Sequence, residues 1–172
     1  MSSRRVRGNT GLRRGVGSKT TDSDEIMEDP PAGDWLMWRR TLNGWGFSPL
    51  DEINRQNVAD LRMVWTRALT EGSQTGTPLA YNGVLYMPNP NDVIQALDAI
   101  TGDLIWEHRR EIPEDASEYF GFLSSNNRNI AIWRDLIIDT SVDDHIFALN
   151  AVTGEQVWQT LVLDYKTHPA TQ

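Results

Sequence analysis

The densest group of potentially reactive side chains is a run of carboxylates, Asp139, Asp143 and Asp144, within the stretch DTSVDD. Three carboxylates this close together could bind a hard cation through their oxygen atoms. The same stretch, however, lies between two predicted strands, where Asp and Ser favour turns through local hydrogen bonds. We therefore expect a turn at residues 141–144 and no metal site.

Other side chains with catalytic potential are sparse. His108, His145 and His168 lie apart, without the spacing of a zinc site or a catalytic triad. The chain has no cysteine, which excludes disulfides, thiolate nucleophiles and zinc sites built on sulfur. The glycines are scattered at turn positions and form no loop that would cradle phosphate.

The charges divide the chain into a basic beginning and an acidic body. The 172 residues have a net charge of -8, yet the first twenty contain several Arg and Lys and no acidic residue. A basic arm can contact nucleic-acid phosphates or open a signal peptide, but no apolar stretch of about 7–15 residues follows, so no signal peptide is visible. The composition of residues 1–33, basic and then acidic, is typical of a disordered tail. We expect no nucleic-acid partner and no membrane span, because no apolar run approaches about eighteen residues.

From Asp34 onward, the sequence predicts an almost purely β domain. Ser48-Pro49, followed by two acids, predicts a short helical turn near 49–56, and the β-branched and aromatic character of 62–69 predicts a strand. Turn signals of the Asn-Gly and Thr-Gly type then separate eight short segments. We expect strands at 77–81, 83–88, 93–98, 104–109, 129–133, 135–140, 144–149 and 156–163.

The chain contains an internal repeat. ALDAITGDLIW at 96–106 returns as ALNAVTGEQVW at 148–158, and the same shift of 52 aligns two further strands upstream of each copy. A four-strand unit repeated about every 40–50 residues is the signature of a propeller blade. Trp106 and Trp158 are expected to dock between blades, with glycines allowing the tight turns, and Trp65 would belong to a third, partial copy.

The repeat, together with FSPLDEINRQNVADLRMVW and TPLAYNGVLYMPNP, resembles the N-terminal part of the quinoprotein alcohol dehydrogenases. Members of that family are eight-bladed β-propellers that use pyrroloquinoline quinone (PQQ) with calcium, and their repeat is the tryptophan-docking motif. The resemblance covers 34–172. It implies a partial β-propeller of about two four-stranded blades plus a leading strand, a periplasmic location, an alcohol substrate and an electron acceptor as partner.

The resemblance also implies cofactor-binding residues. An arginine in an Asn-Arg pair binds a cofactor carboxylate in the family, which here is Arg128, and a guanidinium suits that role because it binds a carboxylate with two parallel hydrogen bonds. A glutamate of many members falls near Thr75, with Gln74 beside it, and Thr171 stands about where the family has a cofactor-contacting threonine. The calcium ligands and the catalytic aspartate of the family belong to later blades, so we expect them beyond Gln172 and no catalytic residue within the chain.

Two functions remain open on these grounds. In the first, the chain is an N-terminal fragment of a PQQ-dependent dehydrogenase, inactive alone, that oxidises an alcohol when complete. The alternative is a propeller-type binding scaffold, like the outer-membrane assembly lipoproteins, without a cofactor. The leading segment and the loop at 127–128 favour the enzyme. In either case we expect an exposed apolar face and an edge strand at 62–69 without its proper partner.

Overall fold

The computed structural model describes residues 24–120 and 126–167. The expectations for residues 1–23, for His168 and for Thr171 therefore lie outside the described residues. Within the described part, no helix has the length and apolar character needed to cross a bilayer.

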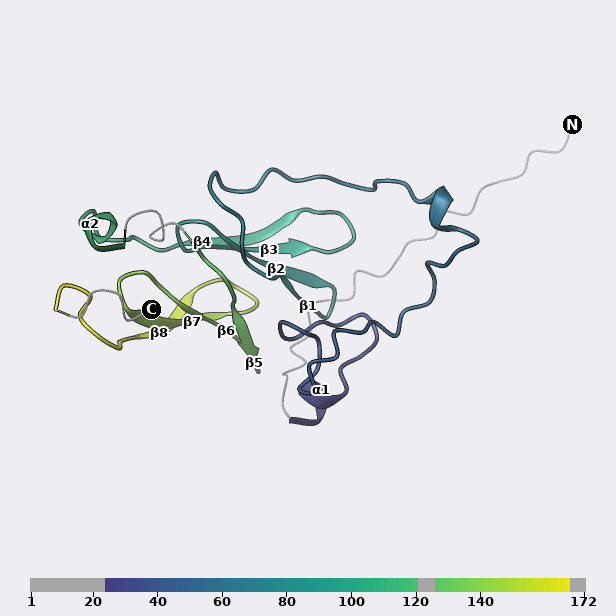
Figure 1. The fold of residues 1–172 in the computed structure, drawn as a ribbon, viewed down its shortest axis with the longest axis horizontal. Coiled ribbons are helices and arrows are strands. Elements are labelled where there is room, and N and C mark those ends of the chain that lie inside the picture. Colours follow the sequence, from purple (N-terminus) through teal and green to yellow (C-terminus); the bar gives the residue numbers. More distant parts are fainter. Residues whose placement is uncertain (1–23, 121–125, 168–172) are drawn as a thin grey trace, which may run out of the picture.

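Two four-stranded antiparallel sheets form the body of the protein, one above the other in Figure 1. In each sheet the strands are neighbours in the order in which they occur along the chain. All eight predicted strands are confirmed, with ends within two residues of the predicted ones. The first sheet contains β1 (Leu79–Tyr81), β2 (Val84–Asn89), β3 (Val93–Asp98) and β4 (Leu104–Arg109), and the second contains β5 (Ala131–Trp133), β6 (Leu136–Thr140), β7 (His145–Asn150) and β8 (Gln156–Leu161).

The turn between the third and fourth strand is built identically in both sheets. The Asp98 carboxylate accepts the backbone N–H groups of Ile100 and Thr101 at 2.8 and 2.9 Å. Asn150 does the same for Val152 and Thr153 at 2.9 and 3.0 Å. Each turn then closes on a glycine with positive φ, a conformation that is strained for other residues. The repeated sequence therefore encodes a repeated turn.

Each of these turns receives a tryptophan from the preceding repeat. Trp106 of β4 is 8% exposed, and its Nε1 donates to Ala151 O at 3.0 Å in the second turn. Trp65 makes the matching bond to Ala99 O at 3.3 Å in the first turn. The repeated docking contact expected of neighbouring blades is therefore present twice.

Trp158 differs from the other two tryptophans of the repeat. It is 38% exposed and meets no Thr-Gly turn within the described residues. The docking expected for Trp158 is thus not seen in this part of the chain.

An apolar core joins the two sheets. Its members come from both sheets and include Ile94, Ala96, Ile137, Phe147 and Leu149, all essentially without exposure. Because these side chains pack across the interface, neither sheet could bury its inner face alone. The fold is that of two adjacent propeller blades.

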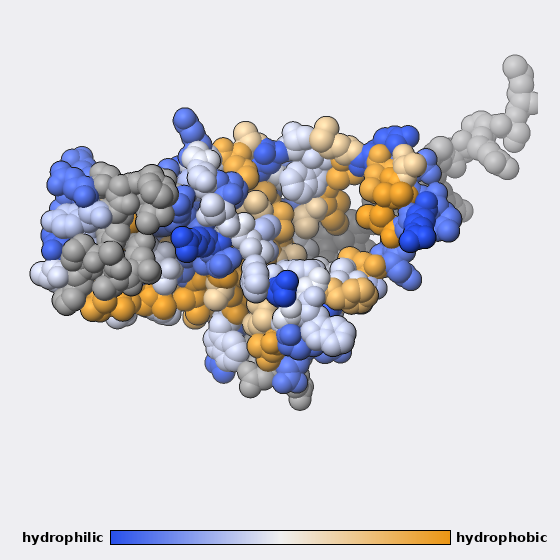
Figure 2. All heavy atoms as spheres, viewed as in Figure 1, coloured by the Kyte–Doolittle hydropathy of each residue, from blue (hydrophilic) through white to orange (hydrophobic). Residues whose placement is uncertain are grey.

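Large apolar side chains also remain on the surface. Figure 2 shows them along the lower edge beneath the second sheet and, at the right, on the extended segment that precedes the first sheet. The exposed set on and just after β8 comprises Val157, Trp158, Leu161, Val162 and Leu163. The expected exposed apolar face is therefore present.

The short helical turn predicted near 49–56 is wrong in position. Residues 49–54 form no helix, and a turn at 55–57 leads into a short 3-10 helix, η1 (Val58–Asp60). The Asn54 and Asn57 side chains accept the N–H groups of Gln56 and Asn54 at 3.0 and 2.8 Å. Such local bonds compete with helical ones. No residue of η1 is buried, so packing does not favour a longer helix.

The predicted strand at 62–69 is also not formed. The segment belongs to the extended arc that carries η1 away from the sheets in Figure 1, and it pairs with no strand in the described part of the chain. Its main attachment is Trp65, docked on the first Thr-Gly turn. The expectation that this segment lacks a proper strand partner agrees with that arrangement.

Residues 24–33 were expected to be part of a disordered tail, but the structure attaches them to the body. They include the helix α1 (Asp24–Glu28), from which Ile26 and Met27 pack against the core. The buried Arg40 side chain donates to Pro30 O at 2.7 Å. A second short helix, α2 (Ala116–Phe120), lies in the connection between the sheets.

Candidate functional site

The segments that precede the two sheets lie side by side. Thr77 and Asn129 form a parallel bridge, and Thr77 N donates to Arg128 O at 3.0 Å. The Thr75 hydroxyl donates to Asn127 O at 3.2 Å. These segments lie at the edge of the sheets where β1 and β5 begin. Because the strands run antiparallel, the β2–β3 and β6–β7 turns lie at the same edge, and the Thr-Gly turns lie at the opposite one.

A hollow of about 510 Å³ opens at this edge, and Arg128 is one of its lining residues. The Arg128 side chain is exposed, whereas Asn127 before it is buried. The other lining residues carry mostly amide and hydroxyl groups, with one carboxylate and one imidazole: Asn126, Asn127, Asn129, Thr140, Ser141, Val142, Asp144, His145 and Val162. The hollow thus offers a guanidinium and neutral donors to an anionic ligand, together with one carboxylate, that of Asp144, which would repel it.

Of the four predicted cofactor-binding residues, Arg128 lines the hollow, while Gln74 and Thr75 lie in the adjoining segment and do not line it. Gln74 Nε2 donates to Pro88 O at 2.6 Å, and Thr75 bonds to the residue just before Arg128. The hydroxyl of Thr75 has one hydrogen, which this bond uses, so toward a ligand it is left as an acceptor. Gln74 retains a second N–H and its carbonyl oxygen. Thr171 lies outside the described residues.

The two blades differ at the position of Arg128. In the repeat register of 52 residues, Arg128 corresponds to Gly76. A Cβ atom on Gly76 would lie 2.5 Å from Pro88 Cγ and 2.9 Å from Arg128 O, distances that real Cβ atoms do not tolerate. The first blade therefore has no room for a side chain where the second carries a guanidinium.

A buried pair of side chains next to Arg128, Asn127 and Asp139, was not predicted from the sequence. Asn127 Nδ2 donates to Asp139 Oδ2 at 2.7 Å, and both side chains are buried. Burial raises the pKa of Asp139 to about 7, although the hydrogen bond from Asn127 acts in the opposite direction. Asp139 stood out in the sequence only as one member of an acidic run.

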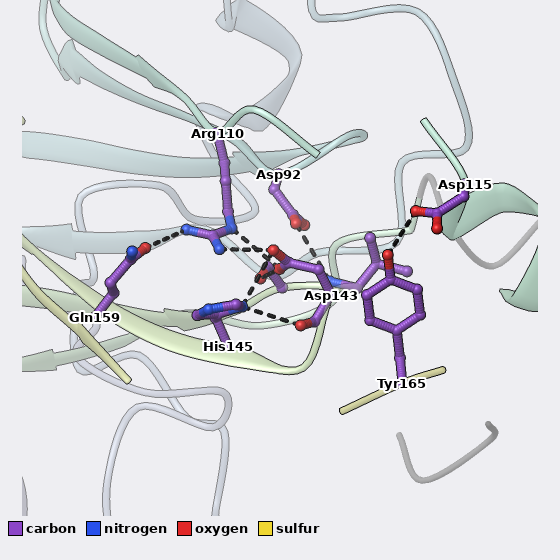
Figure 3. Close-up of polar contacts among 9 residues, drawn as sticks. Asp92, Arg110, Asp115, Asp143, His145, Gln159 and Tyr165 are labelled. Carbon is purple, nitrogen blue, oxygen red and sulfur yellow. Dashed lines mark hydrogen bonds and ion pairs between the residues drawn. The ribbon is translucent and has the colours of Figure 1, made fainter. Parts of the chain in front are cut away.

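A second buried polar cluster joins the blades beside the hollow (Figure 3). Arg110, just after β4, binds both carboxylate oxygens of Asp143, at 3.2 and 2.8 Å, and donates to Gln159 Oε1 at 2.8 Å. Burial is the largest influence on Asp143 and acts to raise its pKa, but the hydrogen bonds from Arg110 and Ser141, together with the charges of Arg110 and His145, outweigh it, so the pKa is lowered. The pKa of neighbouring Asp92 is raised to about 7, mainly by burial.

The acidic run is organised as a turn, as predicted. Asp144 N donates to Ser141 O at 3.0 Å, and Asp144 has a positive φ of 58°. Asp143 is engaged by Arg110 and Asp139 by Asn127, so their carboxylates serve different partners. Among the residues that the structure describes, no three metal-ligating side chains gather at one point. His145 contacts Asp143, and its Nδ1 lies 3.0 Å from Asp143 O.

Comparison with known proteins relates this arrangement to one family. The β-propeller domain model of the PQQ-dependent glucose, ethanol and alcohol dehydrogenases matches residues 35–159. The dehydrogenase subunit of the quinone-linked alcohol dehydrogenase of Gluconacetobacter polyoxogenes is 35% identical over 143 residues, which are 83% of this chain and 19% of that protein. The quinoprotein alcohol dehydrogenase PedH of Pseudomonas putida is 30% identical over 159 residues, covering 90% of this chain and 26% of PedH.

Solved structures agree with these relatives. The quinohemoprotein alcohol dehydrogenase of Comamonas testosteroni matches 81% of the chain with a TM-score of 0.67 at 30% identity, and the match covers 21% of that enzyme. A europium-containing methanol dehydrogenase matches 83% of the chain with a TM-score of 0.73 at 26% identity. The chain thus spans about a fifth to a quarter of the length of the proteins it matches. From its two docked blades and the family match over most of its length, the chain belongs to the PQQ-dependent, quinoprotein alcohol dehydrogenase family of β-propellers.

Proposed function

We propose that the chain supplies two N-terminal blades of a PQQ-dependent dehydrogenase that oxidises an alcohol, and that Arg128 binds a carboxylate of PQQ. The observation that carries this proposal is the exposed Arg128 side chain at the hollow, on a loop whose backbone is fixed by neighbouring segments. When bound, PQQ supplies a two-electron acceptor, and the protein binds and orients it.

The residues present suit such a ligand in part. PQQ carries several carboxylates, and a guanidinium binds a carboxylate with two parallel, charge-assisted hydrogen bonds. Asn126 Oδ1 is buried without a hydrogen-bond partner, so it offers an acceptor at the hollow to an N–H group of a ligand, but not to a carboxylate. Thr75 is less suited, because its hydrogen is already used on Asn127 O.

We assign the remaining chemistry to parts of the enzyme that this chain does not span. The chain corresponds to about a fifth of its relatives, and the family places its calcium ligands and its catalytic aspartate in later blades. We therefore propose that the 172-residue chain alone has no alcohol dehydrogenase activity. The complete enzyme would work in the periplasm and pass its electrons to an acceptor protein or quinone.

Binding of PQQ tests the proposal most simply. PQQ is titrated into the chain while tryptophan fluorescence is followed, for the wild type, Arg128→Ala and Arg128→Lys. Loss of a charged hydrogen bond should weaken binding by about 1.5–3 kcal/mol in Arg128→Ala. The lysine variant keeps the charge but not the paired geometry, so its affinity should lie between the other two. Arg55→Ala, an exposed residue away from the hollow, is the matched control.

Three results would contradict the proposal. Equal affinity of the wild type and Arg128→Ala would remove Arg128 from the binding site. Dye reduction with PQQ, calcium and primary alcohols well above the rate of free PQQ would show that the chain is an active enzyme by itself. Failure of the wild type to bind PQQ, with the fold intact, would instead favour a scaffold without a cofactor.

A further inference from the structure

Asp139 is a buried carboxylate to which neither the fold nor the proposed cofactor contact assigns a role. It lies on β6 and is 2% exposed. Both of its oxygens are used: Oδ2 accepts from Asn127 Nδ2 at 2.7 Å, and Oδ1 accepts from Thr140 N at 2.8 Å. Burying a carboxylate is costly, and here it is offset only in part by hydrogen bonds, since its pKa is raised. Such a cost indicates that the carboxylate serves something beyond packing.

The partner of Asp139 is the residue immediately before Arg128. Asn127 is 4% exposed, its side chain is bound to Asp139, and its carbonyl accepts the Thr75 hydroxyl. The next carbonyl, that of Arg128, accepts Thr77 N. Among the described residues, three hydrogen bonds therefore hold the chain at 127–128, and of these three the one that Asp139 accepts from Asn127 lies within the same blade.

The repeat supports a link between this pair and the arginine. In the register of 52 residues, Asp139 corresponds to Met87, Asn127 to Thr75 and Arg128 to Gly76. The sheet registers agree, because Met87 faces Gln95 and Asp139 faces Phe147, which are again 52 residues apart. The blade without the arginine thus also lacks the Asn-Asp pair. If the pair served only to build a blade, we would expect it in both.

We infer that Asp139 is a positioning residue that holds Arg128 at the cofactor hollow through the side chain of Asn127. This inference rests on the proposed function, in which Arg128 binds a carboxylate of PQQ. A carboxylate is required rather than an amide because two donors, Asn127 Nδ2 and Thr140 N, each take a separate oxygen. An asparagine at 139 would offer one acceptor oxygen and turn an N–H₂ group toward one of these donors.

The test measures the position of the loop without any cofactor. Amide hydrogen exchange of Thr77, whose N–H binds Arg128 O, is followed by NMR in the full chain. In Asp139→Asn, loss of the charged hydrogen bond should make this exchange about tenfold faster. The exchanged pair, Asn127→Asp with Asp139→Asn, restores an amide-carboxylate bond in the opposite order and should return the rate toward that of the wild type.

A matched control separates positioning from general loss of stability. Asp92 is equally buried, at 3% exposure, with its pKa also raised to about 7, but it accepts from Val142 N and not from the loop that carries Arg128. The charge of Asp92 helps to raise the pKa of Asp139, so Asp92→Asn favours the charged form of Asp139 and should not make the exchange of Thr77 faster. Unchanged exchange in Asp139→Asn, or an equal increase in Asp92→Asn, would overturn the inference.

PQQ affinity distinguishes this inference from the function on which it rests. Asp139→Asn should weaken PQQ binding, by no more than Arg128→Ala does, and the exchanged pair should recover it. Arg128→Ala without effect would refute the proposed cofactor contact, while the exchange of Thr77 would still decide whether Asp139 holds the loop. An effect of Arg128→Ala together with none in Asp139→Asn would refute the positioning role alone.

Discussion

Replacing Gly154 by alanine should destabilise the docking contact between the blades. The loss should exceed that of the same replacement at a glycine of similar φ whose added Cβ would meet no other atom. Gly154 has φ +75, which costs an L residue about 1–2 kcal/mol. An added Cβ would also lie 2.6 Å from Trp106 Cδ2 and 2.7 Å from Cε3. Relieving such an overlap in a packed interior typically costs about 1–3 kcal/mol. We expect Gly154→Ala to lower the free energy of unfolding by about 2–5 kcal/mol, the sum of these two ranges.

Gly83→Ala is the control for the backbone term. Gly83 has φ +80, but a Cβ there would meet nothing within 4 Å. Urea unfolding followed by tryptophan fluorescence measures both variants, and Gly83→Ala should lose only about 1–2 kcal/mol. If the two variants lose the same stability, the close packing of Trp106 on the turn contributes nothing, and the account of blade docking is wrong.

Three further changes test the packing and the charges. Arg110→Ala should cost about 3–5 kcal/mol in urea unfolding, because it leaves the buried carboxylate of Asp143 without its cation. Asp92 and Asp139 have pKa values raised to about 7, so these two sites hold more protons in the folded chain than in the unfolded chain. Their contribution to stability should therefore fall as pH rises from about 4 to 7, and urea unfolding of the double Asn variant should lose this contribution to the pH profile. Replacing a buried tryptophan by alanine typically lowers the free energy of unfolding by about 3–5 kcal/mol. Trp158→Ala should lower it by less, because Trp158 is 38% exposed, and thermal unfolding measures the difference.

The features that the sequence predicted well are those encoded within a few residues of one another. The Thr-Gly turns depend on Asp98 and Asn150, whose side chains bond to backbone groups two and three positions later. Strand positions follow from turn signals and from alternation over short segments. The docking of Trp106 could be predicted because the repeat itself shows that one unit must pack on the next.

The features that the sequence did not predict depend on partners brought together by the fold. Asn127 and Asp139 are twelve residues apart, and Arg110 and Asp143 are thirty-three apart. No local pattern marks either pair, because sheet register and blade packing create the contact. The false helix at 49–56 has a local cause instead: helix-start signals were present, but asparagine side chains bind the backbone and no apolar side of the segment is buried.

If this pair of blades presents Arg128 to PQQ, a crystal structure of the chain grown with PQQ should show the contact. The account predicts a guanidinium nitrogen of Arg128 within about 2.7–3.2 Å of a PQQ carboxylate oxygen at the hollow lined by Asn126 and Ser141. PQQ bound at another surface of the chain, with Arg128 making no contact to it, would contradict the account.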